Sequence, residues 1–307
     1  MKQATPFLKW AGGKTQLLKT FQQFYPAELK NGAIKRYFEP FLGSGAVFFD
    51  IVQNYKIASA VLGDINEELI LCYLVIQKDV HKLMEFLQRY KANYLKLPLE
   101  KRKEYFYEIR TAYNQQRFHI DYKQYSENWI PRAAQLIFLN KTCYNGLFRM
   151  NSKGEFNSPT GAYKNPKIFT ETNLNTVSKL LQIADIRKLH FSEIRPLTRK
   201  SSFVYFDPPY RPLTKTANFT SYSTFQFNES EQIALAKLFH DLHQKDTKLM
   251  LSNSDPKNTN PKDDFFDDLY KDFHLYRVKA NRMINSDKNK RGQINEILVT
   301  NYEVLPK

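Results

Sequence analysis

The 307-residue sequence has few cysteines and no long apolar run. Its two cysteines, Cys72 and Cys143, are too few for a disulfide framework or a thiolate metal site, and neither lies in a CxxC pair. No stretch approaches the roughly 18 consecutive apolar residues of a membrane-spanning helix, and the N-terminus lacks the apolar core of a signal peptide. We therefore expect a cytoplasmic protein with no bound metal and no membrane contact.

Acidic residues are also scarce. Lys and Arg number 46 against 31 Asp and Glu, so the net charge is +15. Hydrophobic residues make up 42% of the chain and aromatic residues 15%, which is enough for a substantial core and excludes a disordered chain. A charge of this size favours a polyanionic partner, although basic proteins also bind polyanions nonspecifically.

Strand patterns alternate with helix patterns along most of the chain. Asn228 and Glu231 form a candidate capping pair before a helix whose apolar residues recur at Leu235, Leu238 and Leu242. Strands alternating with helices predict a mainly parallel α/β sheet. The runs rich in β-branched and aromatic residues that predict strands are 36–41, 58–63, 188–192, 202–206, 248–252, 273–278 and 296–301.

The alternation stops between the second and third of these strands. Residues 68–167 show helical spacing instead, as at Val80, Leu83, Met84 and Leu87. This stretch holds 17 Lys and Arg against 9 Asp and Glu, a net charge of +8. We expect a helical insert at 68–167 that carries much of the basic surface, within a domain formed by 1–67 and 168–307.

A predicted strand runs directly into the sequence Asp207, Pro208, Pro209, Tyr210. The carboxyl ends of strands in an open α/β sheet face the ligand crevice. Proline has no backbone N–H, so the turn offers Asp207 and nearby carbonyls as acceptors beside the Tyr210 ring. Such a turn suits an amino group next to an aromatic face, and the alternative is an ordinary X-Pro turn.

A second strand enters the glycine-rich sequence FEPFLGSG, residues 38–45. Glycines allow a ligand close to the backbone. The dinucleotide pattern GxGxxG would require a third glycine where Phe48 stands, so a pyrophosphate ligand is excluded. Asp64 ends the next strand, where a carboxylate commonly binds ribose hydroxyls. The pattern favours an adenosine-containing ligand, although a structural turn is an equally common explanation.

The N-terminal sequence FLKWAGGK, residues 7–14, is similar to a phosphate-binding loop. The Walker pattern requires a glycine five positions before Gly13, and that residue is Leu8. A nucleoside triphosphatase of the P-loop class is therefore excluded.

Together these motifs, with NKTCYNGLFRMNSKGEFNSPTG at 140–161 and INSDKNKRGQINEILVTNY at 284–302, resemble the Dam-type DNA adenine N6-methyltransferases of the alpha group, the D12 class. The resemblance covers nearly the whole chain. It implies a Rossmann-like fold that binds S-adenosylmethionine, with the helical insert recognising DNA. It also implies transfer of a methyl group to N6 of an adenine flipped out of duplex DNA.

The resemblance assigns roles to individual residues. Asp207, Pro208 and Tyr210 would act on the target adenine. The S-adenosylmethionine pocket would be formed by Trp10, Gly12, Lys14, Glu39, Phe41, Gly43, Gly45, Asp64 and Asp207. A recognition hairpin at 141–163, together with Lys9, would contact DNA through Tyr144, Asn145, Leu147, Arg149 and Pro159. Each has a simpler alternative: Arg149 as a phosphate contact, Tyr144 as a hairpin core ring and Lys9 as a solvated charge.

The pattern of Leu147, Arg149 and Pro159 resembles family members that methylate GATC, and Phe148 could alter that site. We expect a monomer in the bacterial cytoplasm at the nucleoid, either solitary or paired with a cognate restriction endonuclease. Two other classes stay open. An RNA or protein-glutamine methyltransferase could use a similar Asp-Pro-Pro-Tyr turn, and a DNA-binding protein could lack catalysis.

Overall fold

The computed structural model describes residues 3–211, 227–281 and 293–304. Within the late motif, residues 284–292 lie outside these ranges. The described chain forms a seven-stranded sheet in the order β3-β2-β1-β4-β5-β7-β6. The first five strands in this order are parallel, and β7 runs antiparallel to both β5 and β6. The strands are β1 (Arg36–Glu39), β2 (Ser59–Asp64), β3 (Ala184–Lys188), β4 (Ser202–Phe206), β5 (Lys248–Ser254), β6 (His274–Asn281) and β7 (Gln293–Thr300).

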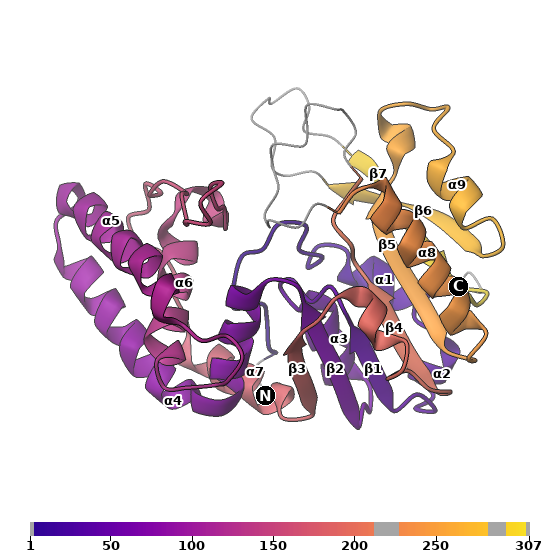
Figure 1. Ribbon diagram of the computed structural model, residues 1–307, viewed down its shortest axis with the longest axis horizontal. Coiled ribbons are helices and arrows are strands. Elements are labelled where there is room, and N and C mark those ends of the chain that lie inside the picture. Colours follow the sequence, from indigo (N-terminus) through magenta and orange to yellow (C-terminus); the bar gives the residue numbers. More distant parts are fainter. Residues whose placement is uncertain (1–2, 212–226, 282–292, 305–307) are drawn as a thin grey trace.

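Helices cover both faces of the sheet (Figure 1). Side chains of β4 alternate between two apolar clusters: Phe203 and Tyr205 pack in the larger one, Val204 and Phe206 in the other. The first cluster includes buried residues of α1 (Leu18–Phe24), α2 (Ala27–Lys30), α3 (Ala46–Asn54) and α7 (Glu171–Leu181). The second includes α8 (Glu229–His243) and α9 (Phe265–Leu269). This arrangement confirms the predicted α/β fold class.

Three further helices form the part of the molecule beside the sheet, and the first of them also packs against β2 and β3 (Figure 1). They are α4 (Glu67–Lys96), α5 (Leu99–Gln116) and α6 (Trp129–Thr142). A buried ion pair joins Arg132 of α6 to Glu68 at the start of α4, and the Arg132 guanidinium also donates to the Tyr113 carbonyl of α5 at 2.9 Å. All three helices are therefore tied at one buried cation. No helix among the described ranges is long and apolar enough to span a membrane.

Sequence patterns located most strands, but the prediction for β3 was wrong. The expected strand at 188–192 lies at Ala184–Lys188, and Phe191–Ile194 form a short 3-10 helix instead. The apolar pattern did not identify this strand because three of its five residues are charged: Asp185, Arg187 and Lys188. Charged residues are common in a strand at the edge of a sheet, which is the position of β3. The capping prediction for α8 is confirmed, since the Asn228 side chain accepts a hydrogen bond from the Glu231 backbone N–H.

Candidate functional site

The chain order of the strands reverses direction beside β1. From β1 the sheet continues to β2 and β3 on one side, and to β4 and β5 on the other. The crevice at such a reversal, beyond the carboxyl ends of the strands, is where open α/β sheets bind ligands. Glu39 ends β1, and Asp207 directly follows β4. The two carboxylates predicted from separate motifs therefore lie at the same crevice.

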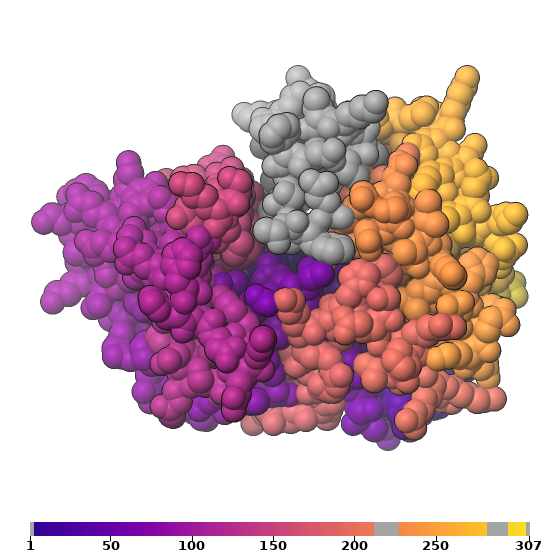
Figure 2. Space-filling view, viewed as in Figure 1, coloured from indigo at the N-terminus to yellow at the C-terminus, as the bar shows by residue number. Residues whose placement is uncertain are grey.

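A cavity of about 370 Å³ occupies this position, a volume within the range of small-molecule sites. Figure 2 shows the surface hollowed between α4–α6 and the sheet part of the molecule. Ten of the eleven predicted cofactor and catalytic residues line the cavity: Trp10, Gly12, Lys14, Glu39, Phe41, Gly43, Asp64, Asp207, Pro208 and Tyr210. Gly45 does not line it.

Lys14 and Asp207 form the polar centre of the cavity. Lys14 Nζ lies 2.7 Å from Asp207 Oδ1 and donates hydrogen bonds to the Gly12 carbonyl at 2.8 Å and to the Tyr210 hydroxyl at 3.1 Å. Burial alone would lower the pKa of Lys14, but the negative charge around it, chiefly Asp207, raises the pKa above its ordinary value. The surroundings of Lys14 therefore favour its charged form beside Asp207.

The Asp-Pro-Pro-Tyr turn is held from behind by buried polar side chains. The Gln232 amide of α8 donates to the Pro209 carbonyl at 3.0 Å. Ser252 donates to Asp207 Oδ1 at 3.2 Å. Lys14 and Ser252 both contact Oδ1 of Asp207. Its other oxygen, Oδ2, has no hydrogen-bond partner within the described ranges, so it is available to a ligand.

Asp64 lines the cavity and also makes hydrogen bonds within its own loop region. Its Oδ2 accepts from the Gly43 backbone N–H and its Oδ1 from that of Asn66, both at 3.0 Å. The carboxylate thus fixes the glycine-rich loop, and each oxygen keeps a second lone pair for a ribose hydroxyl. Gly45 supports the same loop from outside the cavity: its φ is +68°, and a Cβ there would lie 2.6 Å from the Tyr73 hydroxyl oxygen.

Phe191 and Phe227, which the sequence prediction missed, form one wall of the cavity together with the predicted Phe41. Phe41 stacks on Phe191 with ring centroids 5.6 Å apart, and the Phe227 ring meets Phe41 edge-on at 5.5 Å. All three residues line the cavity. Correct placement of β3 would have revealed Phe191, because it follows that strand at its carboxyl end. This wall suits a planar ring such as adenine.

The predicted DNA-contacting residues gather at a second place. Segment 141–163 folds back on itself: the Tyr144 N–H donates to the Pro159 carbonyl at 2.8 Å, and the Asn157 N–H donates to the Arg149 carbonyl at 2.9 Å. Tyr144, with 60% of its surface exposed, Asn145, Arg149 and Pro159 are exposed, whereas Leu147 is half-buried. None of them lines the cavity.

The hairpin and the cavity are joined through the N-terminal loop. Asn140, fully buried, accepts from the Lys9 N–H at 2.8 Å and donates to the carbonyls of Lys9 at 2.9 Å and Gly146 at 3.0 Å. Phe148 of the hairpin stacks on Trp10 of the cavity wall at 5.1 Å. The Lys9 side chain lies over the Tyr163 ring. The hairpin is therefore fixed relative to the cavity.

Comparisons with known proteins agree with this geometry. The family model for D12 class N6 adenine-specific DNA methyltransferases matches residues 10–284. The type II methyltransferase M.MjaIII of Methanocaldococcus jannaschii is 50% identical over 97% of this chain and 99% of its own length. M1.LlaDCHI of Lactococcus lactis is 37% identical over 97% of this chain and 95% of its own length. The DNA adenine methylase of Escherichia coli K12 is 33% identical over the same shares. The chain belongs to the D12 class of N6 adenine-specific DNA methyltransferases.

Proposed function

We propose that the protein transfers the methyl group of S-adenosylmethionine to N6 of an adenine flipped out of duplex DNA, within the sequence GATC. The observation that carries the proposal is the Asp-Pro-Pro-Tyr turn at the strand reversal, where Asp207 and Tyr210 line the same cavity as the glycine-rich loop. A methyl donor and an amine acceptor can therefore meet at Asp207.

The cavity residues fit S-adenosylmethionine. Phe41, Phe191 and Phe227 offer aromatic surface for its adenine, and Asp64 keeps lone pairs for ribose hydroxyls. Glu39, buried at the end of β1, is held by a 2.7 Å hydrogen bond from the Tyr37 hydroxyl. Asp64, Asp207 and Glu39 line the cavity. Burial raises the pKa of each carboxyl group, and a cationic ligand would favour their charged forms. The cofactor, when bound, supplies a methyl group on a positively charged sulfur.

Asp207 prepares the target amine for attack. The lone pair of adenine N6 is delocalised into the ring, so the amine is a weak nucleophile until acceptors hold its hydrogens. Asp207 Oδ2 and the Pro208 carbonyl are two acceptors at the turn, and neither proline competes as a donor. Tyr210 offers a ring face on which the base stacks. Catalysis then consists of positioning and electrostatic stabilisation by this chain's own groups.

Residues 68–167 recognise the DNA in this proposal. Their net charge of +8 suits phosphate contacts, and the exposed hairpin residues Tyr144 and Arg149 suit insertion into the duplex and guanine reading. Flipping the adenine costs a few kcal/mol, which stacking on Tyr210 and filling of the gap by Tyr144 offset. GATC rests on the Leu147, Arg149 and Pro159 pattern.

The names of the two type II relatives favour a role beside a cognate restriction endonuclease. We propose that the protein acts as a monomer on the bacterial chromosome.

Labelled methyl transfer from S-adenosylmethionine to duplex DNA, RNA and protein, measured in parallel, tests the proposal. We expect label in the duplex alone, at adenine N6, and in GATC duplexes well above duplexes with one changed base pair. Label in RNA or protein would favour the other methyltransferase classes. Absence of transfer to any substrate, with DNA binding retained, would favour a DNA-binding protein without catalysis.

A further inference from the structure

Glu296 is a buried acidic residue beside Tyr210 that lies within the late motif at 284–302 but was assigned no role. It lies on β7 with 7% of its surface exposed. Its Oε1 accepts a hydrogen bond from the Tyr210 hydroxyl at 2.9 Å, and that hydroxyl accepts from Lys14 Nζ at 3.1 Å. By the sum of these two distances, Lys14 Nζ lies no more than 6.0 Å from Glu296 Oε1.

The second carboxylate oxygen of Glu296 is buried and without a partner among the described residues. A buried acceptor left unsatisfied destabilises the folded protein, and more so when it is charged. Burial raises the pKa of Glu296, while the charge of Lys14 opposes this shift. An unpaired carboxylate oxygen near Lys14 and Tyr210 therefore suggests that Glu296 has a partner at some stage of the reaction.

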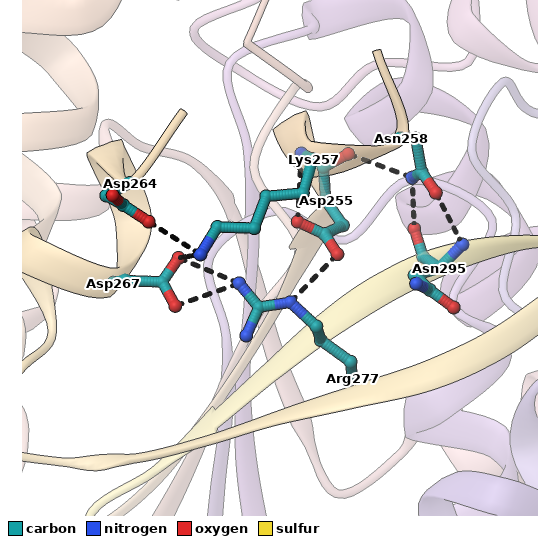
Figure 3. A network of polar contacts seen from close by, with 7 residues as sticks. All are labelled: Asp255, Lys257, Asn258, Asp264, Asp267, Arg277 and Asn295. Carbon is teal, nitrogen blue, oxygen red and sulfur yellow. Dashed lines mark hydrogen bonds and ion pairs between the residues drawn. The ribbon is translucent and has the colours of Figure 1, made fainter. Parts of the chain in front are cut away.

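The strand that carries Glu296 is firmly held. The Asn258 amide donates to the Asn295 carbonyl at 2.7 Å, and its Oδ1 accepts from the Asn295 N–H at 2.9 Å. Asp255, which accepts from Arg277 Nε at 3.0 Å, belongs to the same network (Figure 3). Because successive side chains of a strand point to opposite faces, this clamp on Asn295 fixes the direction of Glu296.

Lys14 has no spare donor in this arrangement. An ammonium has three N–H groups, and they go to the Gly12 carbonyl, the Tyr210 hydroxyl and Asp207 Oδ1. A target amine must then share Asp207 with a full positive charge, which weakens the carboxylate as an acceptor for the amine. A second acceptor near Lys14 would relieve this competition. Glu296, whose Oε1 already accepts from the Tyr210 hydroxyl that Lys14 contacts, carries an unpaired acceptor among the described residues at Oε2.

We infer that Glu296 is a positioning residue for methyl transfer: Oε1 holds the Tyr210 ring for stacking, and Oε2 receives the Lys14 ammonium when the adenine amine occupies Asp207. The inference rests on the proposed function, because it requires a flipped adenine. It deepens that function because Glu296, about 90 positions away in the sequence, would control both the position of the Tyr210 ring and the strength of Asp207 as an acceptor.

Two substitutions separate the two roles. Glu296→Gln keeps an oxygen for the Tyr210 hydroxyl but lacks the charge that would attract Lys14, whereas Glu296→Ala lacks both. The probe is a duplex that the wild type methylates, with 2-aminopurine in place of the target adenine, whose fluorescence reports its environment on flipping. Single-turnover methylation of the unlabelled duplex and DNA affinity are measured beside it.

We expect the wild-type fluorescence change to persist in Glu296→Gln and to be altered in Glu296→Ala. The single-turnover rate should fall about tenfold in Glu296→Gln and further, towards 100-fold, in Glu296→Ala, the loss expected for misplaced reacting groups. DNA affinity should stay within about twofold, since Glu296 is buried and lies outside the basic stretch 68–167. On a Tyr210→Phe background, which lacks the shared hydroxyl, the Ala and Gln variants should become alike.

Glu303→Gln, at an exposed acid of the same terminal segment, is the matched control and should behave as the wild type. A wild-type rate in Glu296→Gln would overturn the role of Oε2, and wild-type fluorescence in Glu296→Ala would overturn that of Oε1. If the wild type itself gives no fluorescence change on a duplex that it methylates, base flipping fails and the proposed function must be revised instead.

Discussion

The cavity at the strand reversal and the hairpin at 141–163 present their side chains in opposite ways. In the cavity, Lys14 contacts Asp207 at 2.7 Å and the Tyr210 hydroxyl at 3.1 Å, and Lys14 is only 3% exposed. In the hairpin, Tyr144 and Arg149 are exposed, and Arg149 is held by hydrogen bonds to Asn157 alone among the described residues.

This difference matches two physical tasks. Catalysis by positioning requires groups that are placed before the substrate arrives, so the cavity groups are cross-linked by ion pairs and hydrogen bonds. Recognition of a duplex requires side chains that exchange water for phosphates and base edges, so the hairpin groups remain in solvent. A change in the cavity should therefore affect the reaction, and a change in the hairpin should affect which DNA is bound.

Replacing Asp207 tests the cavity side of the comparison and should give the largest effect. Asp207→Ala should lose all but a few per cent of methyl transfer, because the target amine loses its carboxylate acceptor. DNA affinity should change little, since Asp207 does not contact phosphates. Asp207→Asn should keep some activity through its amide oxygen. Turnover and DNA affinity of each variant are the measurements.

Because Asp207→Ala leaves Lys14 buried without its ion-pair partner, the thermal midpoint must be measured as well. Asp268→Ala, at an exposed acid of α9, is the matched control and should retain wild-type activity. Substantial turnover by a folded Asp207→Ala protein would contradict the proposed activation of the amine.

The salt dependence of DNA binding tests the proposed role of the basic stretch 68–167, to which the hairpin belongs. If the charge of 68–167 contacts phosphates, the logarithm of the DNA association constant should fall linearly with the logarithm of salt concentration, with a slope of about −0.9 for each phosphate contact. Binding of one duplex across a salt series measures this slope. A slope near zero would mean that the basic residues of the insert are not the DNA footprint.

Sequence patterns predicted the position of a strand well where that strand is apolar. β4 was placed at its observed bounds because every residue of Ser202–Phe206 is buried between two layers and its sequence is continuously apolar after the first serine. β3 was misplaced because an edge strand has fewer neighbours and tolerates charge, as at Asp185 and Arg187. The apolar pattern of a sequence thus indicates which residues are buried, and a strand with few buried residues can be missed.

The site was predictable where residues adjacent in sequence form it. Glycine-rich and proline-rich turns at strand ends pointed to Gly43 and Asp207. Phe227 and Glu296 reach the centre from outside any such turn, and only the sheet topology brings them there. Asn140 was missed as a clamp because a buried asparagine on a helix has no sequence signature until its partners in the N-terminal loop are known.

Arg149 tests how the hairpin reads DNA. If its guanidinium contacts a guanine edge, Arg149→Ala should cost about 1–3 kcal/mol on the cognate site and much less on sites already changed at that base pair. The measurement is kcat/KM on GATC duplexes and on variants with one changed base pair. Lys153→Ala, at an exposed cation of the same hairpin, is the matched control and should weaken all duplexes alike. The same uniform loss in Arg149→Ala would make Arg149 a backbone anchor.

A change at Lys141, where the hairpin begins, should have the smallest effect on DNA affinity. Lys141 is half-buried, between the buried cavity groups and the exposed hairpin groups. Burial, with the nearby charges of Lys9 and Lys167, lowers the pKa of Lys141 to about 8. Phosphates near the hairpin would favour its charged form and raise this pKa again, so binding takes up protons and affinity should fall several-fold as the pH rises from about 7 to 9. Lys141→Arg keeps its charge throughout this range and should show a flatter dependence. Equal pH dependence of DNA affinity in the two proteins would place Lys141 away from the phosphates and narrow the recognition surface to the exposed part of the hairpin.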